Sequence, residues 1–212
     1  QGAHIHLQKK CIKILPQEHK VLVQDVKTQQ TEEIEYDKLA ITTGARPIIP
    51  SVKNIQLENI FTVRKVQDGI NIRNKMRASE SKKAVIVGGG YIGIEMLEAF
   101  FLNGFEIYLI EKGSHILPIF DAEISDMIKD EIVRMSNGKV HIITDDAVAA
   151  FQGANKVEKV VTEKGKIIDT DIVIVCVGVA PNTEIAADAG IQLGVSNAIR
   201  VNNRMQTSEK DI

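Results

Sequence analysis

The feature that most constrains this chain is a glycine-rich segment, AVIVGGGYIGIEM, at residues 84–96. Its first four residues predict a short strand that is covered on both faces, and a helix is predicted from Tyr91 onward. Between them, Gly88, Gly90 and Gly93 have the spacing G-x-G-x-x-G. Such glycines permit a tight turn, close approach of a diphosphate to the backbone, and close packing of the helix on the sheet. Since the helix start also offers N–H groups and a positive dipole end, the segment predicts a dinucleotide-binding unit.

An acidic residue at the end of the next predicted strand, residues 105–111, strengthens this interpretation. Glu111 lies about 20 residues after the first glycine, where a carboxylate accepts hydrogen bonds from ribose hydroxyls. It would repel the 2′-phosphate of NADP, so NAD(H) is favoured, although Lys112 and His115 could soften the preference. The alternative is that Glu111 only ends a strand in solvent. The predicted cofactor-binding residues of this unit are Gly88, Gly89, Gly90, Tyr91, Ile92, Gly93, Glu111 and Lys112.

The order of the remaining elements predicts an α/β fold of the Rossmann-like type, with a parallel sheet, helices and a small antiparallel meander as three layers. Short apolar runs predict the strands, and apolar residues at helical spacing predict the helices. Asp121 is the expected N-cap of the third helix, and Gly104 the expected end of the second. Strands are expected at 7–15, 20–27, 32–42, 84–87, 105–111, 139–144 and 171–178, helices at 62–76, 91–103 and 121–135, a break at 44–52, and the meander at 147–169.

Composition excludes several other classes of protein. The net charge of −2, aromatic content of 4% and absence of Trp argue against a nucleic-acid-binding protein. No apolar run is long enough to span a membrane. The two cysteines, Cys11 and Cys176, form no CxxC or zinc spacing, so we expect a reduced, cytoplasmic chain in which Cys176 is an inert buried thiol and Cys11 is not catalytic. His4 and His6 would share one side of a strand, but without a third ligand we expect no metal.

Four segments in this order resemble the pyridine nucleotide-disulfide oxidoreductases, flavoproteins with two dinucleotide-binding domains. The segment ILPIFDAEI is most similar to the branch of NADH oxidases, NADH peroxidases and coenzyme A-disulfide reductases. The resemblance covers essentially the whole chain. The segments are YDKLAITTGARP (36–47), VIVGGGYIGIEM (85–96), ILPIFDAEI (116–124) and DIVIVCVGVAPNTE (171–184).

The resemblance implies a division of the chain. Residues 1–48 would belong to an FAD-binding domain, residues 49–198 would form an inserted NAD(P)H-binding domain, and residues 199–212 would begin the return to the FAD domain. Because the sequence starts without Met and stops at Asp211-Ile212, we expect an excised piece of a longer protein, which would be a homodimer. The first flavin glycine motif and a redox-active cysteine have no counterpart here.

The resemblance also implies roles for two residues on the helix after the glycines. Tyr91 would lie over the flavin and move aside for the nicotinamide; its alternative role is packing at the helix entry. Glu95 would lie near the nicotinamide and the flavin edge; alternatively, it only complements the helix dipole. These are the expected catalytic residues.

Two further segments carry expected binding residues. Val177 and Gly178 would place backbone against the nicotinamide ribose and carboxamide, and the alternative is a structural turn. Thr43 and Gly44 would approach the flavin, and the alternative is a linker turn that also includes Arg46.

The activity that the resemblance implies is hydride transfer from NADH, with NADPH as the alternative donor, to FAD, followed by reduction of oxygen, peroxide or a disulfide. The piece alone should show little turnover. Two alternatives stay open: a reductase that serves a ferredoxin or rubredoxin, and a non-enzymatic domain that senses NADH.

Overall fold

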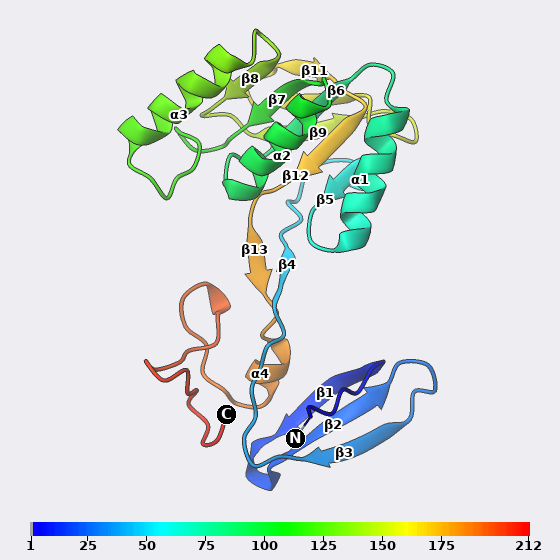
Figure 1. The fold of residues 1–212 in the computed structure, drawn as a ribbon, viewed down its shortest axis with the longest axis vertical. Coiled ribbons are helices and arrows are strands. Elements are labelled where there is room, and N and C mark those ends of the chain that lie inside the picture. The colour runs from blue at the N-terminus through cyan, green and yellow to red at the C-terminus, as the bar shows by residue number, and fades with distance from the viewer. Residues whose placement is uncertain (1) are drawn as a thin grey trace. The chain divides into compact units, whose positions relative to one another are not determined.

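The chain forms two compact units in the computed structural model, which describes residues 2–212 (Figure 1). Among the described residues, the first unit comprises residues 2–46 and 180–212, and the second comprises residues 47–179. Three clusters of buried apolar side chains form the cores of the units. Two clusters lie wholly within the second unit, and one lies wholly within the first.

The second unit is built on a five-stranded parallel sheet with the strand order β5-β12-β6-β7-β8. Strand β6 is central, and all four residues from Ala84 to Val87 are buried, as the unalternating apolar run predicts for a strand covered on both faces. The strands are β5 (Ile60–Thr62), β6 (Lys83–Val87), β7 (Glu106–Ile110), β8 (Val140–Ile143) and β12 (Ile172–Val175).

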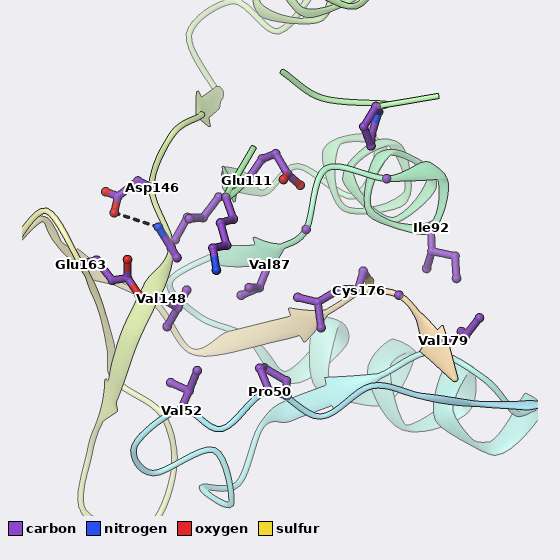
Figure 2. A pocket seen from close by; sticks show the side chains of 18 of the residues that line it. Pro50, Val52, Val87, Ile92, Glu111, Asp146, Val148, Glu163, Cys176 and Val179 are labelled. Carbon is purple, nitrogen blue, oxygen red and sulfur yellow. Dashed lines mark hydrogen bonds between the residues drawn. The ribbon is translucent and has the colours of Figure 1, made fainter. Parts of the chain in front are cut away.

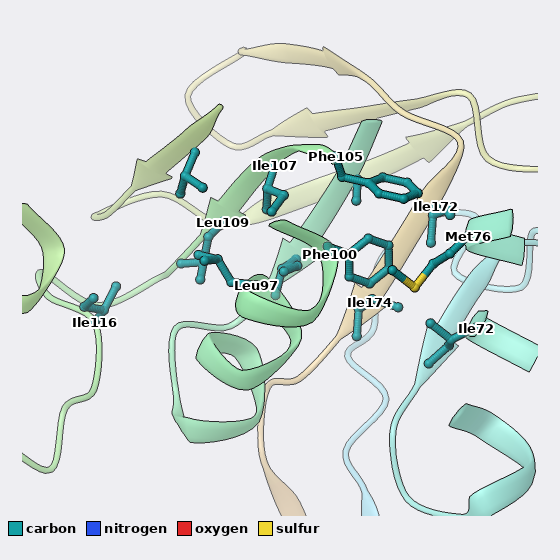
Figure 3. Close-up of a cluster of buried hydrophobic side chains, with 13 residues drawn as sticks. Ile72, Met76, Leu97, Phe100, Phe105, Ile107, Leu109, Ile116, Ile172 and Ile174 are labelled. Atoms are coloured by element: carbon teal, nitrogen blue, oxygen red, sulfur yellow. The ribbon is translucent and has the colours of Figure 1, made fainter. Parts of the chain in front are cut away.

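Three helices belong to the layer on one face of this sheet, namely α1 (Val66–Ala78), α2 (Tyr91–Leu102) and α3 (Ala122–Met135). Alternate strand residues, such as Ile86 and Ile107, meet Phe100 from α2 in one cluster (Figure 3). The rings of Phe100 and Phe105 pack edge to face with their centroids 4.9 Å apart, a favoured aromatic geometry.

A small antiparallel sheet packs on the other face. Its strands are β9 (Val148–Gln152), β10 (Lys159–Thr162) and β11 (Ile167–Asp169), in the order β11-β10-β9. Val85 and Val87, which alternate with the helix-facing residues of β6, are buried with Phe151 and Val160. The three predicted layers are therefore confirmed.

The first unit contains an antiparallel sheet of β1 (Lys9–Leu15), β2 (Lys20–Asp25) and β3 (Thr31–Glu35). Short helices are η1 (Pro16–Glu18), α4 (Glu184–Asp188) and η2 (Val195–Asn197). Ile14 and Val21 are buried with Ala186 and Ile191, so the segment after residue 180 shares a core with the first strands.

The second compact unit ends at residue 179, and beyond it Ala186 and Ile191 bury their side chains in the first unit's cluster. The assignment of residues 49–198 to an NAD(P)H-binding domain stays a prediction. The chain passes between the units along β4 (Ala45–Pro47) and β13 (Val179–Pro181), which pair as a two-stranded sheet.

Two predicted elements differ most from the structure in their bounds. The strand expected at 32–42 ends at Glu35, since Leu39 then donates its N–H to the Asp211 carbonyl instead of to a strand. The helix expected from residue 62 begins at Val66, because β5 occupies residues 60–62 and Asp68 accepts the N–H groups of Arg64 and Lys65.

Asp121 occupies the N-cap position of α3, as the sequence predicts, although its side chain makes no capping hydrogen bond. One local expectation needs correction: His4 and His6 precede β1 and are exposed, outside any strand. Among residues 2–212, no group of three or more His, Cys, Asp or Glu side chains is arranged to hold a metal ion.

Candidate functional site

A cavity of about 740 Å³ opens in the second unit, where β6 and β12 end (Figure 2). In the sheet, β6 lies between β7 on one side and β12 on the other. The strands that follow β6 in the sequence are therefore added on both of its sides. Open α/β sheets bind ligands at such a switch point, outside the carboxyl ends of the strands. The walls include Pro50, Val52, Gly88, Gly90, Glu111, Lys112, Asp146, Val148, Glu163, Cys176 and Gly178.

The three glycines of the motif have three different surroundings. Gly88 has φ +106°, and a Cβ on it would lie 2.4 Å from the Cys176 carbonyl oxygen. A Cβ on Gly93 would lie 2.0 Å from the carbonyl oxygen of Gly88. Around Gly90, by contrast, a Cβ would meet nothing within 4 Å. The first and third glycines thus permit the turn and the close approach of α2, and the second leaves backbone exposed to the cavity.

Glu111 holds in place the turn of residues 88–90 between β6 and α2, which we call the glycine turn. Its Oε2 accepts the N–H of Gly89 and its Oε1 accepts the N–H of Gly113, each at 2.6 Å. The turn receives a second support from Leu117, whose N–H donates to the Gly89 carbonyl at 2.7 Å. The sequence predicted a carboxylate at this cavity but not these two backbone contacts.

The residues at the start of α2 are exposed at the cavity. Tyr91 is 55% exposed and meets Phe120 edge to face, with ring centroids 6.3 Å apart. Ile92 lines the cavity, as does Lys112. Glu95, also on α2, is exposed but does not line the cavity.

The loop after β12 forms the opposite rim. Val177 and Gly178 line the cavity, and Gly178 has φ +110°. The Gly178 carbonyl accepts the N–H of Ile48 at 3.0 Å. The cavity therefore brings Gly88, Gly90, Tyr91, Ile92, Glu111, Lys112, Val177 and Gly178 together, with Gly89 and Gly93 supporting the turn.

Cys176 also lines the cavity, one residue beyond the end of β12 rather than within the strand. Burial raises the pKa of its thiol to about 12. Since the thiolate is the reactive form, this agrees with the expected inert thiol. Cys11 is exposed in the first unit, where partial burial also raises the pKa of its thiol.

Two acidic residues of the cavity wall were missed from the sequence. Asp146 is buried, and its Oδ1 accepts the N–H groups of Ala147 at 2.9 Å and Lys164 at 3.2 Å. Burial alone would raise the pKa of Asp146, but hydrogen bonds from Thr162, Lys164 and Ala147 hold it below its usual value. Glu163 lies in the turn between β10 and β11 and is exposed. Only tertiary structure brings these residues to the glycine turn, so no sequence signal identified them.

The remaining expected binding residues, Thr43 and Gly44, lie in the first unit. The Thr43 hydroxyl donates to the Asn182 carbonyl at 2.5 Å, and the Gly44 carbonyl accepts the Asn182 N–H at 2.9 Å. Arg46 donates to Oδ1 of Asn182 at 3.0 Å and pairs with Glu184 at 2.7 Å. These contacts join residues 43–46 to residues 182–184, and Gly44 adopts φ +69°. Their role toward a flavin stays a prediction.

No helix among residues 2–212 has the length and apolar character needed to cross a membrane.

The parallel sheet, its switch-point cavity and the glycine turn define a Rossmann-like α/β nucleotide-binding class of protein. The pyridine nucleotide-disulphide oxidoreductase family matches residues 1–212. This chain belongs to that family, as the resemblance of its four segments predicts.

Curated relatives support the same assignment. An NADH oxidase of Enterococcus faecalis is 37% identical over 213 residues, covering 100% of this chain and 46% of the relative. A CoA-dependent NAD(P)H sulfur oxidoreductase of Pyrococcus abyssi is 36% identical over 179 residues, covering 84% of this chain and 39% of the relative. The chain therefore spans less than half the length of these relatives.

Similar solved structures support the same family assignment. An NAD-dependent persulfide reductase from A. fulgidus is 28% identical with a TM-score of 0.88, covering 96% of this chain and 37% of that one. A water-forming NADH oxidase from Lactobacillus brevis, bound to NADH, is 26% identical with a TM-score of 0.85, covering 96% and 44%. A ferredoxin reductase from Rhodopseudomonas palustris is 27% identical with a TM-score of 0.85, covering 96% and 48%.

Proposed function

We propose that this chain is the NAD(H)-binding portion of a flavoprotein oxidoreductase that takes hydride from NADH. One observation carries the proposal: Gly90 exposes its backbone to a cavity that Glu111 also lines, with nothing within 4 Å of the position a Cβ would take. Such a cradle fits a diphosphate held at a helix N-terminus, with a carboxylate near the ribose.

In this proposal, each part of the cavity wall would hold one part of the dinucleotide. The diphosphate would lie at the turn of residues 88–90, and the adenosine ribose would lie near Glu111. The nicotinamide half would extend toward Val177 and Gly178, on the opposite rim. Because Glu111 is an anion, we expect NADH to bind more tightly than NADPH, with Lys112 reducing the difference.

FAD, when bound in the complete protein, would accept hydride from the nicotinamide, and this chemistry belongs to the cofactors. This chain would contribute alignment and exclusion of water. Tyr91, with its exposed ring at the cavity, is proposed to lie over the flavin and move aside for the nicotinamide, and Glu95 to lie near the nicotinamide and the flavin edge. Thr43 and Gly44 are proposed to approach the flavin.

The final electron acceptor is proposed to be oxygen, peroxide or a disulfide. The NADH oxidase and the CoA-dependent sulfur oxidoreductase among the relatives support these classes of acceptor. A second candidate, transfer to an iron-sulfur protein, is favoured by the similarity to a ferredoxin reductase. We further expect the complete protein to be cytoplasmic, from its sparse cysteines, and homodimeric, from the family resemblance.

The substitution Gly90→Val tests the proposal. The added side chain would fill the space proposed for the diphosphate without meeting protein atoms nearby. We expect this variant to fold normally but to lose at least about tenfold in NADH affinity. Calorimetric titration of the 212-residue chain with NADH, and thermal unfolding of the same samples, would measure both properties.

Gly69→Val is the matched control. Gly69 lies on α1, away from the cavity wall, and also has nothing within 4 Å of a Cβ. The control should bind NADH like the unmodified chain. Unchanged binding by Gly90→Val, or no binding by the unmodified chain, would contradict the proposed function.

A further inference from the structure

The cavity wall includes a carboxylate, that of Glu163, for which the glycine motif predicts no role. Glu163 lines the wall beside Asp146, at the end away from Ile92 and Val179 (Figure 2). Among residues 2–212, its side chain has no hydrogen-bond or ion-pair partner, whereas the carboxylates of Glu111 and Asp146 already accept backbone N–H groups. Glu163 is therefore an acidic side chain of this wall whose full hydrogen-bonding capacity is open to a ligand.

Backbone hydrogen bonds fix the position of Glu163 along the cavity. The Asp146 N–H donates to the Glu111 carbonyl at 3.3 Å, and the Glu163 N–H donates to the Ala147 carbonyl at 2.7 Å. These bonds place three chain segments side by side, with residues 146–147 in the middle. Since hydrogen-bonded neighbouring strands lie about 4.8 Å apart, two such steps allow the backbone of Glu163 to lie up to about 10 Å from that of Glu111.

This spacing matches the next part of the proposed ligand. If the ribose lies near Glu111, the base extends toward residues 146–148 and its far edge points toward Glu163. Buried Val148 and half-buried Val52 give this end of the cavity apolar walls suited to a flat ring. An ionised carboxylate at the edge of such a slot accepts hydrogen bonds and donates none.

We propose that Glu163 selects the base of the dinucleotide by accepting a hydrogen bond from the exocyclic amine of adenine. The inference rests on the proposed NADH-binding function and names the part of the ligand that this wall recognises. A purine with a carbonyl at the same position, such as hypoxanthine, would bring an acceptor against an acceptor and bind more weakly.

Asp146 holds this selecting residue in place. Its carboxylate accepts N–H groups from both Ala147 and Lys164, and so fastens the turn between β10 and β11 to the segment after β8. Asp146 is therefore a positioning residue, and Glu163 the one that would touch the ligand.

The test compares NADH with the reduced nicotinamide hypoxanthine dinucleotide by calorimetric titration of the 212-residue chain. We expect NADH to bind about tenfold more tightly, the effect of losing one charge-assisted hydrogen bond at an exposed edge. Glu163→Gln should reduce this ratio to less than about threefold, because an amide can both accept from the amine and donate to the carbonyl.

Glu158→Gln is the matched control, since Glu158 is an exposed glutamate of the same meander that does not line the cavity. It should keep the full ratio, and thermal unfolding should show that both variants are folded. Equal binding of the two dinucleotides by the unmodified chain, or an unchanged ratio in Glu163→Gln, overturns this inference alone. Absence of NADH binding overturns the proposed function and this inference together.

Discussion

Glu111 has two roles: it stabilises the glycine turn, and it is proposed to bind the ribose of the dinucleotide. Its two oxygens accept N–H groups from Gly89 and Gly113, on opposite sides of the carboxylate. Each carboxylate oxygen has a further lone pair, so these contacts leave room for ribose hydroxyls. They orient the side chain before any ligand arrives, which reduces the cost of ordering it on binding.

This double role shapes the prediction for Glu111→Ala. The change removes the negative charge and also leaves two backbone N–H groups without their acceptor. We expect about 1–3 kcal/mol of destabilisation, and a several-fold decrease in the preference for NADH over NADPH because the repulsion of the 2′-phosphate is lost. Urea unfolding would give the first quantity, and titration with the two dinucleotides the second.

Glu123→Ala provides the comparison, because Glu123 is an exposed acid outside the cavity wall. It should leave the dinucleotide preference unchanged. A Glu111→Ala variant that keeps the original preference would show that this carboxylate does not choose between the cofactors.

Single residues differ in how well the sequence predicts their surroundings. Gly88, Gly90 and Gly93 were predictable, because each glycine answers a local need for a turn, an open backbone or close packing. Asp146 and Glu163 were not predictable, because long-range hydrogen bonds bring them to the cavity: Lys164 donates to Asp146, and Glu163 donates to Ala147. The contact of Glu111 with the Gly89 N–H was missed for the same reason, since these residues lie 22 positions apart.

At the scale of elements, helix α2 lies very close to the turn that precedes it. A Cβ on Gly93 would lie 2.0 Å from the Gly88 carbonyl oxygen, which is backbone and cannot rotate away. Gly93→Ala should therefore push α2 off the sheet and destabilise the chain by about 3 kcal/mol or more. Urea unfolding monitored by far-UV circular dichroism would measure the change.

Gly69→Ala should change the free energy of unfolding in the opposite direction and stabilise the chain. Gly69 lies inside α1 with free space around its Cβ position, and replacing glycine by alanine in a helix stabilises it by up to about 1 kcal/mol. Equal stabilities of the two variants would contradict the assignment of Gly93 as a packing position.

The sequence predicted an element best where the residue pattern of that segment alone determines its structure. Strand β6, helix α2 and the meander were all predicted close to their observed bounds. The strand expected at 32–42 was too long, because its apolar residues Leu39 and Ile41 pack against the first unit's cluster without continuing the ladder. The helix α1 leaves Val66 and Ile70 exposed, so helical spacing alone did not identify its buried face.

At the scale of the whole molecule, each unit keeps its own core. The two larger clusters contain only residues between 47 and 179, and so does the cavity wall. We predict that residues 47–179, expressed alone, fold and bind NADH with an affinity within about threefold of the 212-residue chain. Calorimetry and circular dichroism would test this.

A failure of residues 47–179 to fold would show that the segments outside this range contribute to its stability. The matching piece that ends at residue 198 offers a direct comparison. Its extra residues include Ala186 and Ile191, which would lose their burial partners, so the longer piece should be less soluble.

The paired strands β4 and β13 give the second unit neighbouring ends. The Ile48 N–H reaches the Gly178 carbonyl at 3.0 Å, so the chain enters and leaves this unit about one strand spacing apart. A module joined in this way can be exchanged for another whose ends are equally close, because the host needs to bridge no new gap. Preference for a different nucleotide could then be acquired by recombination at two points, without rebuilding the rest of the polypeptide.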